Sequence, residues 1–190
     1  MNLPSVVSRP EWNAARKDLL AKEKDLTKAR DVLNAERRRL PMVEIEKDYT
    51  FQGPDGEVGL TDLFEGRHQL IVYHFWFEPD EDPCQGCSLW TSDLGDLANL
   101  HEHDTSLTFV SRAPIDQIDS VKKSRGWTIP WFSLDDNDFN TDTGYVGVAQ
   151  VSVFVREADA VFLTYTTQGG DLENLSNHWS LLDRTPVGSS

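Results

Sequence analysis

Cysteine is scarce in this chain of 190 residues, and the two that occur lie close together as Cys84 and Cys87. A framework of several disulfides is therefore excluded. Basic residues are also in the minority, because 18 Lys and Arg stand against 32 Asp and Glu and give a formal net charge of -14. A surface this acidic repels phosphate backbones and anionic lipid, so we expect no nucleic-acid partner.

Long apolar segments are missing as well. No apolar run approaches the ~20 residues that span a bilayer, so we expect no membrane partner. The first ten residues lack the charged start and apolar stretch of a secretory signal, which predicts a cytoplasmic protein. In that compartment a close pair of cysteines is more typical of catalysis or metal binding than of a structural disulfide.

The length and a hydrophobic share of 38% indicate one domain with an appendage. We expect residues 1–41 to form an N-terminal helical arm and residues 42–190 to form the domain. One long helix over residues 10–40 is predicted, because Pro10 suits a first helical turn and Pro41 ends the segment.

Apolar residues recur every seven positions along this helix, at Trp12, Leu19, Leu26, Leu33 and Leu40. The stripe is narrower than a full coiled-coil seam, because the positions between carry charge. It predicts either a dimerisation arm, which would make the protein a homodimer through the N-terminal helix, or a helix that lies across its own domain.

The rest of the chain alternates between strand and helix patterns. The predicted elements are a hairpin at 49–60, a short helix at 61–64, strands at 69–77, 107–111, 130–134, 151–155 and 161–165, and helices at 84–103, 114–124 and 171–182. Alternation that ends in a hairpin and a helix predicts an α/β fold, a three-layer α/β/α sandwich around a mixed sheet.

The two cysteines form the motif Cys84-Gln85-Gly86-Cys87, which follows the apolar strand 69–77 after a short acidic loop. A strand, a loop and C-x-x-C at the start of a helix are typical of a thioredoxin-type redox site. Cys84 is the candidate nucleophile, since a helix N-terminus favours a thiolate. Cys87, one turn further on, is the candidate resolving thiol.

Four acidic residues precede the motif, at Glu78 and at 80–82, and like charge disfavours a thiolate there. We therefore expect a reducing or slowly reacting pair. Further candidates for lining the site are His74, Arg112, Trp76 and Trp131. His74 is either a base near the motif or a hydrogen-bonded core histidine, and Arg112 either reaches the site or pairs with a surface carboxylate.

Metal binding is the main competing chemistry. Cys84 and Cys87 with His101 and His103 would supply a zinc set, but a continuous helix would carry the histidines about 25 Å away. The acidic segment 135–142 lacks the glycine and the closing glutamate of a calcium loop, so a solvated turn is expected. We predict no metal and no cofactor.

Many short motifs in order resemble a bacterial family of thioredoxin-like proteins of unknown function, often labelled predicted dithiol–disulfide oxidoreductases. They are Trp12–Arg16, Glu36–Pro41, Asp62–Phe64, Gln69–Phe75, Cys84–Ser88, Ser111–Pro114, Gly126–Trp131, Asp138–Asn140, Val151–Phe154, Thr164–Tyr165 and Leu182–Asp183. The resemblance implies a thioredoxin-like fold with an N-terminal helical extension, akin to the peroxiredoxin-like branch. It also implies protein or small-molecule thiols and disulfides as partners.

The chain departs from thioredoxin enzymes at residues 148–151, where those enzymes have a cis-proline and this sequence has none. The departure keeps open an alternative, a catalytically inert thioredoxin-like binding module. In that alternative Trp90, Trp127 and Trp131 would line a groove or interface.

Overall fold

The computed structural model describes residues 3–134 and 138–187 and divides the chain into two compact units. One unit comprises Met1–Pro41 with Ser180–Ser190, and the other is Met42–Trp179. The two units are described separately. The second unit contains the sheet and both cysteines.

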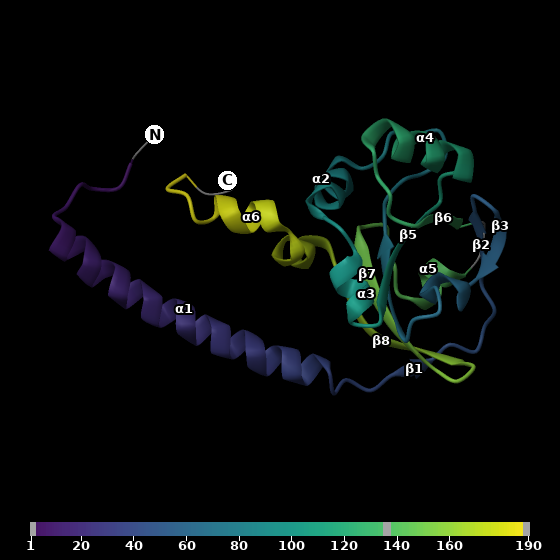
Figure 1. Ribbon diagram of the computed structural model, residues 1–190, viewed down its shortest axis with the longest axis horizontal. Coiled ribbons are helices and arrows are strands. Elements are labelled where there is room, and N and C mark those ends of the chain that lie inside the picture. The colour runs from purple at the N-terminus through teal and green to yellow at the C-terminus, as the bar shows by residue number, and fades with distance from the viewer. Residues whose placement is uncertain (1–2, 135–137, 188–190) are drawn as a thin grey trace. The chain divides into compact units, whose positions relative to one another are not determined.

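The first unit contains the long helix α1 (Arg9–Arg37), whose first residues explain where it starts (Figure 1). Ser8 and Glu11 form a capping box, in which each side chain accepts a hydrogen bond from the other residue's backbone N–H. The predicted helix is confirmed, although it ends at Arg37 and not at residue 40. None of the described residues of α1 is buried.

An eight-stranded mixed sheet forms the centre of the second unit among the described residues. The strands are β1 (Val43–Glu44), β2 (Thr50–Gly53), β3 (Gly56–Gly59), β4 (Gln69–His74), β5 (Thr105–Ser111), β6 (Trp131–Leu134), β7 (Gln150–Glu157) and β8 (Ala160–Gln168). Their order is β1-β8-β7-β4-β5-β6-β2-β3. β4 lies between β5, to which it is parallel, and β7, to which it is antiparallel, so the cysteine motif follows a central strand.

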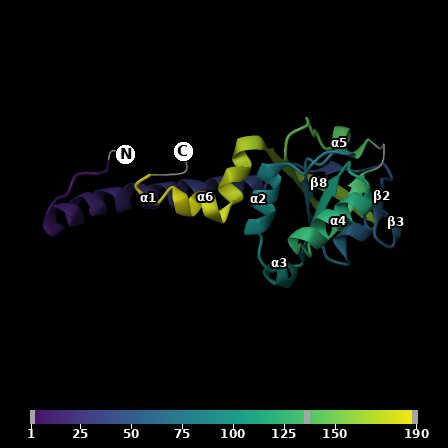
Figure 2. The ribbon, with the colours of Figure 1, turned by 90° about the horizontal axis from the view of Figure 1, so that it is seen from above.

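Helices cover both faces of this sheet (Figure 2). The helical segments that follow α1 are η1 (Asp62–Phe64), α2 (Gln85–Asp93), α3 (Ala98–Glu102), α4 (Ile115–Arg125), α5 (Phe139–Asp142), η2 (Gly169–Leu175) and α6 (Asn177–Leu182), the last of which crosses the boundary between the units. Side chains of α2, α3 and α4 pack on one face, and side chains of η1 and α5 pack on the other. The expected three-layer α/β/α sandwich around a mixed sheet is confirmed.

Alternation along β4 divides the core into two halves. Tyr73 and Phe75 lie in the cluster beneath α2 and α4, whereas Leu70 and Val72 lie in the cluster beneath η1 and α5. All four side chains are buried, and each contributes roughly 2 kcal/mol through the area that it removes from water. Neighbouring residues of this strand therefore face opposite layers.

The predicted continuous helix over 84–103 is wrong, because α2 ends at Asp93 and α3 begins at Ala98. Leu94 adopts an extended backbone, and the Asp96 carboxylate accepts a hydrogen bond from the Ala98 N–H at 2.9 Å. The expected helix over 171–182 is likewise divided into η2 and α6. Both breaks depend on side-chain contacts that periodicity does not encode.

The hairpin and the closing strand pair are confirmed as β2–β3 and β7–β8. In the acidic segment 135–142, residues 135–137 lie outside the described part of the chain, and α5 begins at Phe139. Asp142 accepts hydrogen bonds from Lys47 at 2.7 Å and from Tyr49 at 2.6 Å. Within the described residues, no helix is long and apolar enough to cross a bilayer.

Candidate active site

The end of β4 brings the chain to the cysteine motif. Phe75 still pairs with the neighbouring strand through its N–H and the Val110 carbonyl at 2.9 Å. The acidic loop, residues 78–82, then turns the chain back, so that the Cys84 N–H donates to the Trp76 carbonyl at 3.1 Å. Gln117 of α4 holds this loop, because its amide donates to the Glu81 carbonyl at 3.0 Å. The loop therefore places Cys84 beside the strand that precedes it.

Cys84 is the N-cap of α2, as the motif predicts. Its Sγ accepts a hydrogen bond from the Cys87 N–H at 3.5 Å, and its carbonyl accepts one from the Ser88 N–H at 2.9 Å. The Cys84 side chain is partly exposed. The Cys87 N–H and the positive end of the helix dipole therefore point at this sulfur.

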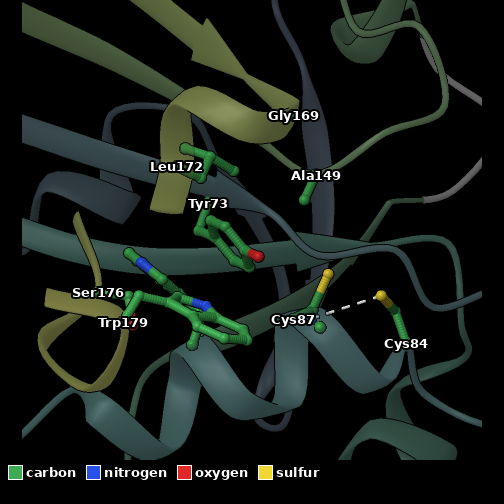
Figure 3. Close-up of a pocket in the computed structure, with 10 residues that line it drawn as sticks. Tyr73, Cys84, Cys87, Ala149, Gly169, Leu172, Ser176 and Trp179 are labelled. Carbon is green, nitrogen blue, oxygen red and sulfur yellow. Dashed lines mark hydrogen bonds between the residues drawn. The ribbon is translucent and has the colours of Figure 1, made fainter. Parts of the chain in front are cut away.

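Cys87 lies one helical turn further on and is only 2% exposed. Burial raises the pKa of its thiol, while hydrogen bonds from the Tyr73 hydroxyl and the Trp76 backbone act in the opposite direction. Figure 3 shows the Tyr73 hydroxyl pointing toward the Cys87 sulfur. Both thiols are free. One sulfur is thus accessible and the other is shielded behind it.

The face of the sheet that carries the cysteines also carries a pocket of about 220 Å³ (Figure 3). The described residues that line it are Tyr73, Cys84, Gly86, Cys87, Trp90, Ala149, Gly169, Leu172, Ser176 and Trp179. We call it the dithiol pocket. Tyr73 and Trp90 form one wall, with ring centroids 4.2 Å apart and planes inclined by 19°.

A carboxylate holds the segment that contributes Leu172 and Trp179 to this pocket. Asp93, at the end of α2, accepts hydrogen bonds from the Ser176 hydroxyl, the His178 ring and, at 3.2 Å, the His178 N–H. Burial raises the pKa of Asp93, but these hydrogen bonds outweigh it and lower the pKa below its usual value. The contacts tie residues 176–178 to α2.

His74 lies on the other face of the sheet, away from the layer that contains α2 and Cys87. Its ring stacks on Phe139, its Nδ1 hydrogen-bonds the Asn140 side chain at 2.8 Å, and its Nε2 hydrogen-bonds Ser152 at 2.9 Å. Burial lowers the pKa of His74 to about 4, so the ring is neutral near pH 7. Both ring nitrogens are engaged, which leaves neither for proton transfer at Cys84.

Tyr145 connects the two faces. Its ring stacks on His74 with centroids 5.4 Å apart. Burial raises the pKa of Tyr145 to about 12, and the charges of Glu78 and the two cysteines contribute in the same direction. Tyr145 therefore stacks on His74, while the charges of Glu78 and the two cysteines act on its hydroxyl.

Arg112 lies at the rim, where its side chain is 57% exposed and pairs with Glu78 at 3.7 Å. Trp76 acts through its backbone, which contacts both cysteines, while its indole is largely exposed. Trp131 is buried in the core, and its indole N–H donates to Ser111 at 2.9 Å. Of the predicted lining residues, only the Trp76 backbone contacts a sulfur.

The residues that would form a zinc site or a tryptophan-lined groove lie apart from one another. Trp127 packs on Trp131 with ring centroids 6.1 Å apart, on the core side of α4, while Trp90 lines the dithiol pocket. His101 belongs to α3 and His103 follows it. Among the described residues, no group of three His, Cys, Asp or Glu side chains is arranged to hold a metal ion.

Tyr73, Trp179 and Leu172 were not among the residues that the sequence singled out. For Tyr73 the sequence holds a signal, which is the alternation of a strand. Residues two apart share a face, so Tyr73 lies on the same side of the sheet as Phe75. For Trp179 and Leu172 the sequence offers no signal, since residues 169–179 reach the pocket through tertiary contacts.

Solved structures to which the chain is similar include three proteins of low sequence identity. A thiol:disulfide interchange protein from Bacteroides sp. is 12% identical, with a TM-score of 0.49, and the match covers 80% of this chain and 93% of that one. Peroxidoxin BcpB from Mycobacterium tuberculosis is 16% identical over 68% of this chain and 85% of its own, with a TM-score of 0.48. StoA from Bacillus subtilis is 9% identical over 66% and 90%, with a TM-score of 0.48.

No curated protein matches the sequence. A family model does match, and it spans residues 1–190. The family is described as "Bacterial protein of unknown function (DUF899)". The match agrees with the bacterial family of unknown function that the motifs of the sequence resemble. The chain belongs to this family.

Proposed function

We propose that this protein is a thiol–disulfide oxidoreductase that uses Cys84 as its nucleophile and Cys87 as its resolving thiol. One observation carries the proposal: Cys84 is partly exposed at the N-cap of α2 and accepts the Cys87 N–H, while Cys87 is buried one turn behind it. The accessible sulfur meets the substrate, and the shielded one is reached only from within the protein.

The reaction is a pair of exchanges. The Cys84 thiolate attacks one sulfur of a disulfide, forms a mixed disulfide and expels the first thiolate of the substrate. The Cys87 thiolate then attacks the Cys84 sulfur and expels the second, so the dithiol loses two electrons and becomes a disulfide. Burial raises the pKa of Cys87 and so disfavours its thiolate. The Tyr73 hydroxyl and the Trp76 N–H offset part of this effect by hydrogen-bonding the thiolate.

The remaining candidate residues act at a distance in this proposal. Arg112 and Glu78 form a pair at the rim, and Trp131 supports the core beneath the motif. His74 positions Tyr145 from the opposite face of the sheet. We further propose a reducing compartment, the cytoplasm, where a dithiol of this kind stays available for reaction.

The alternative is an inert binding module, which the burial of Cys87 favours. A redox titration separates the two. The reduced protein is equilibrated across a series of thiol–disulfide buffers, and free thiols are counted at each potential. We expect two thiols to disappear together in one reversible step, whereas thiols that remain throughout the physiological range would rule out the enzyme.

A trapping experiment adds a matched pair of variants. In Cys87→Ser, the mixed disulfide at Cys84 cannot be resolved and accumulates on exposure to a disulfide. In Cys84→Ser, the buried Cys87 is left alone and forms little adduct. Equal adduct on both variants, measured by intact mass, would contradict the division of roles between the two cysteines.

We also propose that residues 1–41 are an arm through which two copies of the chain pair. Trp12, Leu19, Leu26 and Leu33 of α1 are each at least 45% exposed, and large apolar side chains at such spacing are typical of helix pairing. Light scattering at micromolar concentration should give a dimer, and Leu26→Glu should give a monomer with an unchanged dithiol. A monomeric wild-type protein would contradict the proposal.

A further inference from the structure

We propose that the dithiol pocket binds a small, uncharged, aromatic disulfide and that Cys84 and Cys87 reduce it. The inference rests on the proposed function and names the class of substrate. It follows from the lining of the pocket, its size, its charge and the way the chain itself covers the edge where a peptide would dock.

The lining of the pocket is aromatic and aliphatic. Tyr73 and Trp90 stack face to face, and Trp179 and Leu172 contribute further apolar surface. None of the described lining residues is charged. A flat ring is the ligand that such walls fit best, since aromatic rings pair by stacking and by edge-to-face contact.

The size of the pocket limits its ligand. At about 220 Å³ it is smaller than the ~300–1,000 Å³ that holds a drug-sized molecule. The space accommodates one ring with a sulfur directed at the dithiol. The second half of a disulfide then extends past Cys84, which is the exposed end of the motif.

The backbone at which an extended peptide would dock is already hydrogen-bonded within the chain. The Ala149 carbonyl, which lines the pocket, accepts a hydrogen bond from the Gly169 N–H at 3.0 Å. Gln150 next to it pairs with Gln168 of β8. A peptide that docks as an added strand needs free backbone groups at this point. The Ala149 carbonyl is not free, because Gly169, directly after β8, already donates to it.

The charge around the motif disfavours anionic disulfides. Glu78 and residues 80–82 precede Cys84, and the whole chain carries -14. A disulfide with carboxylates, such as oxidised glutathione, is repelled as it approaches, whereas an uncharged one is not.

One polar group of the wall is unpaired. The indole N–H of Trp90 is buried and has no hydrogen-bond partner among the described residues. Buried donors are nearly always paired, so an unpaired one on the wall of a pocket favours a ligand that carries an acceptor. A ring nitrogen or an ether oxygen meets this requirement without adding charge.

The chemistry balances without a cofactor. The Cys84 thiolate expels one aromatic thiolate, the Cys87 thiolate expels the other, and the two protons of the dithiol pass to the released thiols. Two electrons leave the protein, which becomes the disulfide. An external dithiol restores the reduced form for a further cycle.

The test compares two aromatic disulfides that differ in charge. Reduced full-length protein reacts in a single turnover with dithiodipyridine, which is uncharged and has ring acceptors, or with dithiobis(nitrobenzoate), which is anionic. Each rate is divided by the rate of free dithiothreitol with the same reagent. We expect a preference of about tenfold or more for the uncharged reagent.

Variants separate the pocket from charge alone. Trp179→Ala removes one wall, so most of the preference should disappear, and Leu172→Ala provides a second variant if the first is unstable. Trp12→Ala, an exposed tryptophan of α1, should keep the preference. A preference that survives both pocket variants, or that equals that of free dithiothreitol, would overturn the proposal. Faster reduction of insulin than of dithiodipyridine would overturn it too.

A binding experiment distinguishes failure of the proposed substrate class from failure of the proposed function. Cys84→Ser lacks the proposed nucleophile, and its binding of 2-(methylthio)pyridine, an uncharged aromatic thioether with a ring nitrogen, is followed by ligand-observed NMR. We expect binding that Trp179→Ala weakens. Absence of binding, with a normal redox titration of the wild-type protein, removes the substrate class and leaves the oxidoreductase. Binding without any reversible disulfide removes the oxidoreductase.

Discussion

The Tyr73 hydroxyl, on the strand that precedes the motif, points toward the sulfur of Cys87 in the helix that follows it and acts to lower the pKa of that thiol (Figure 3). Burial raises the pKa of Tyr73 far above its usual value, so the phenol stays protonated and remains a donor. Its ring simultaneously stacks on Trp90 in the wall of the dithiol pocket. One side chain therefore contacts both the resolving thiol and the space for a substrate.

Replacing this hydroxyl should slow resolution. In Tyr73→Phe the stacked ring remains, but the Cys87 thiolate loses a donor and its pKa rises further. We expect the second exchange to slow by about tenfold at neutral pH and to recover toward alkaline pH. The mixed disulfide at Cys84, quantified by quenched-flow mass spectrometry, should accumulate.

Tyr49→Phe is the matched control for Tyr73→Phe. Its hydroxyl donates to Asp142 on the other face of the sheet, away from the cysteines. Resolution should keep the wild-type rate in this variant. If the two variants slow resolution equally, the effect is one of stability and not of the contact with Cys87.

Gly86 lies beside Cys84 in the lining of the dithiol pocket. A Cβ built at Gly86 meets the Cys84 sulfur at 3.9 Å and has no closer contact, so alanine fits without a clash. Gly86→Ala should raise the free energy of unfolding by roughly 0.5–1 kcal/mol, because glycine is costly inside a helix. The methyl group should slow the reaction of Cys84 with bulky disulfides. Chemical denaturation and single-turnover rates check the two effects, and an unchanged rate would show that Gly86 does not border the approach.

Much of the fold was predictable because its signals are local. The apolar run over 69–77 and the glycines around 53–56 correctly predicted the β2–β3 hairpin and β4, although β4 ends at His74. The division of residues 84–103 into α2 and α3 was not predictable, because it depends on the hydrogen bond from the Ala98 N–H to Asp96 and on where α2 packs. Periodicity identifies elements but does not encode where tertiary contacts end them.

The site was predictable only in part, for a related reason. The position of Cys84 at the N-cap of α2 follows from strand, loop and helix in order. Alternation implied that Tyr73 and His74 face opposite layers, but the sequence does not say which layer α2 covers. A preference for histidine as a base therefore favoured His74, while the contact with Cys87 belongs to Tyr73.

His74 should make stability depend on pH. Its pKa is about 4 in the folded protein against 6.5 for an ordinary histidine, so the unfolded chain binds more protons between these values. The contribution of the neutral His74 ring to the free energy of unfolding is fully present above pH 6.5. It is lost as the pH falls through 4, and the loss is roughly 3 kcal/mol at most. His74→Gln should be less stable at pH 7 yet show a flatter decline. Urea denaturation across this range measures it, with His103→Gln as the control, and parallel curves would contradict the assignment.

The last prediction concerns Asp93, whose carboxylate holds Ser176 and His178 against α2. In Asp93→Asn the charge is lost and the hydrogen bonds weaken, so residues 169–179 should open about tenfold more often. Hydrogen exchange of this segment should quicken while β4 and β5 stay protected. Because Leu172 and Trp179 line the dithiol pocket, the preference for an uncharged aromatic disulfide should fall in parallel. Asp96→Asn, which removes a carboxylate charge beside α3 and leaves the contacts of Asp93 intact, should leave both readouts unchanged; faster exchange without loss of preference would separate the segment from substrate binding.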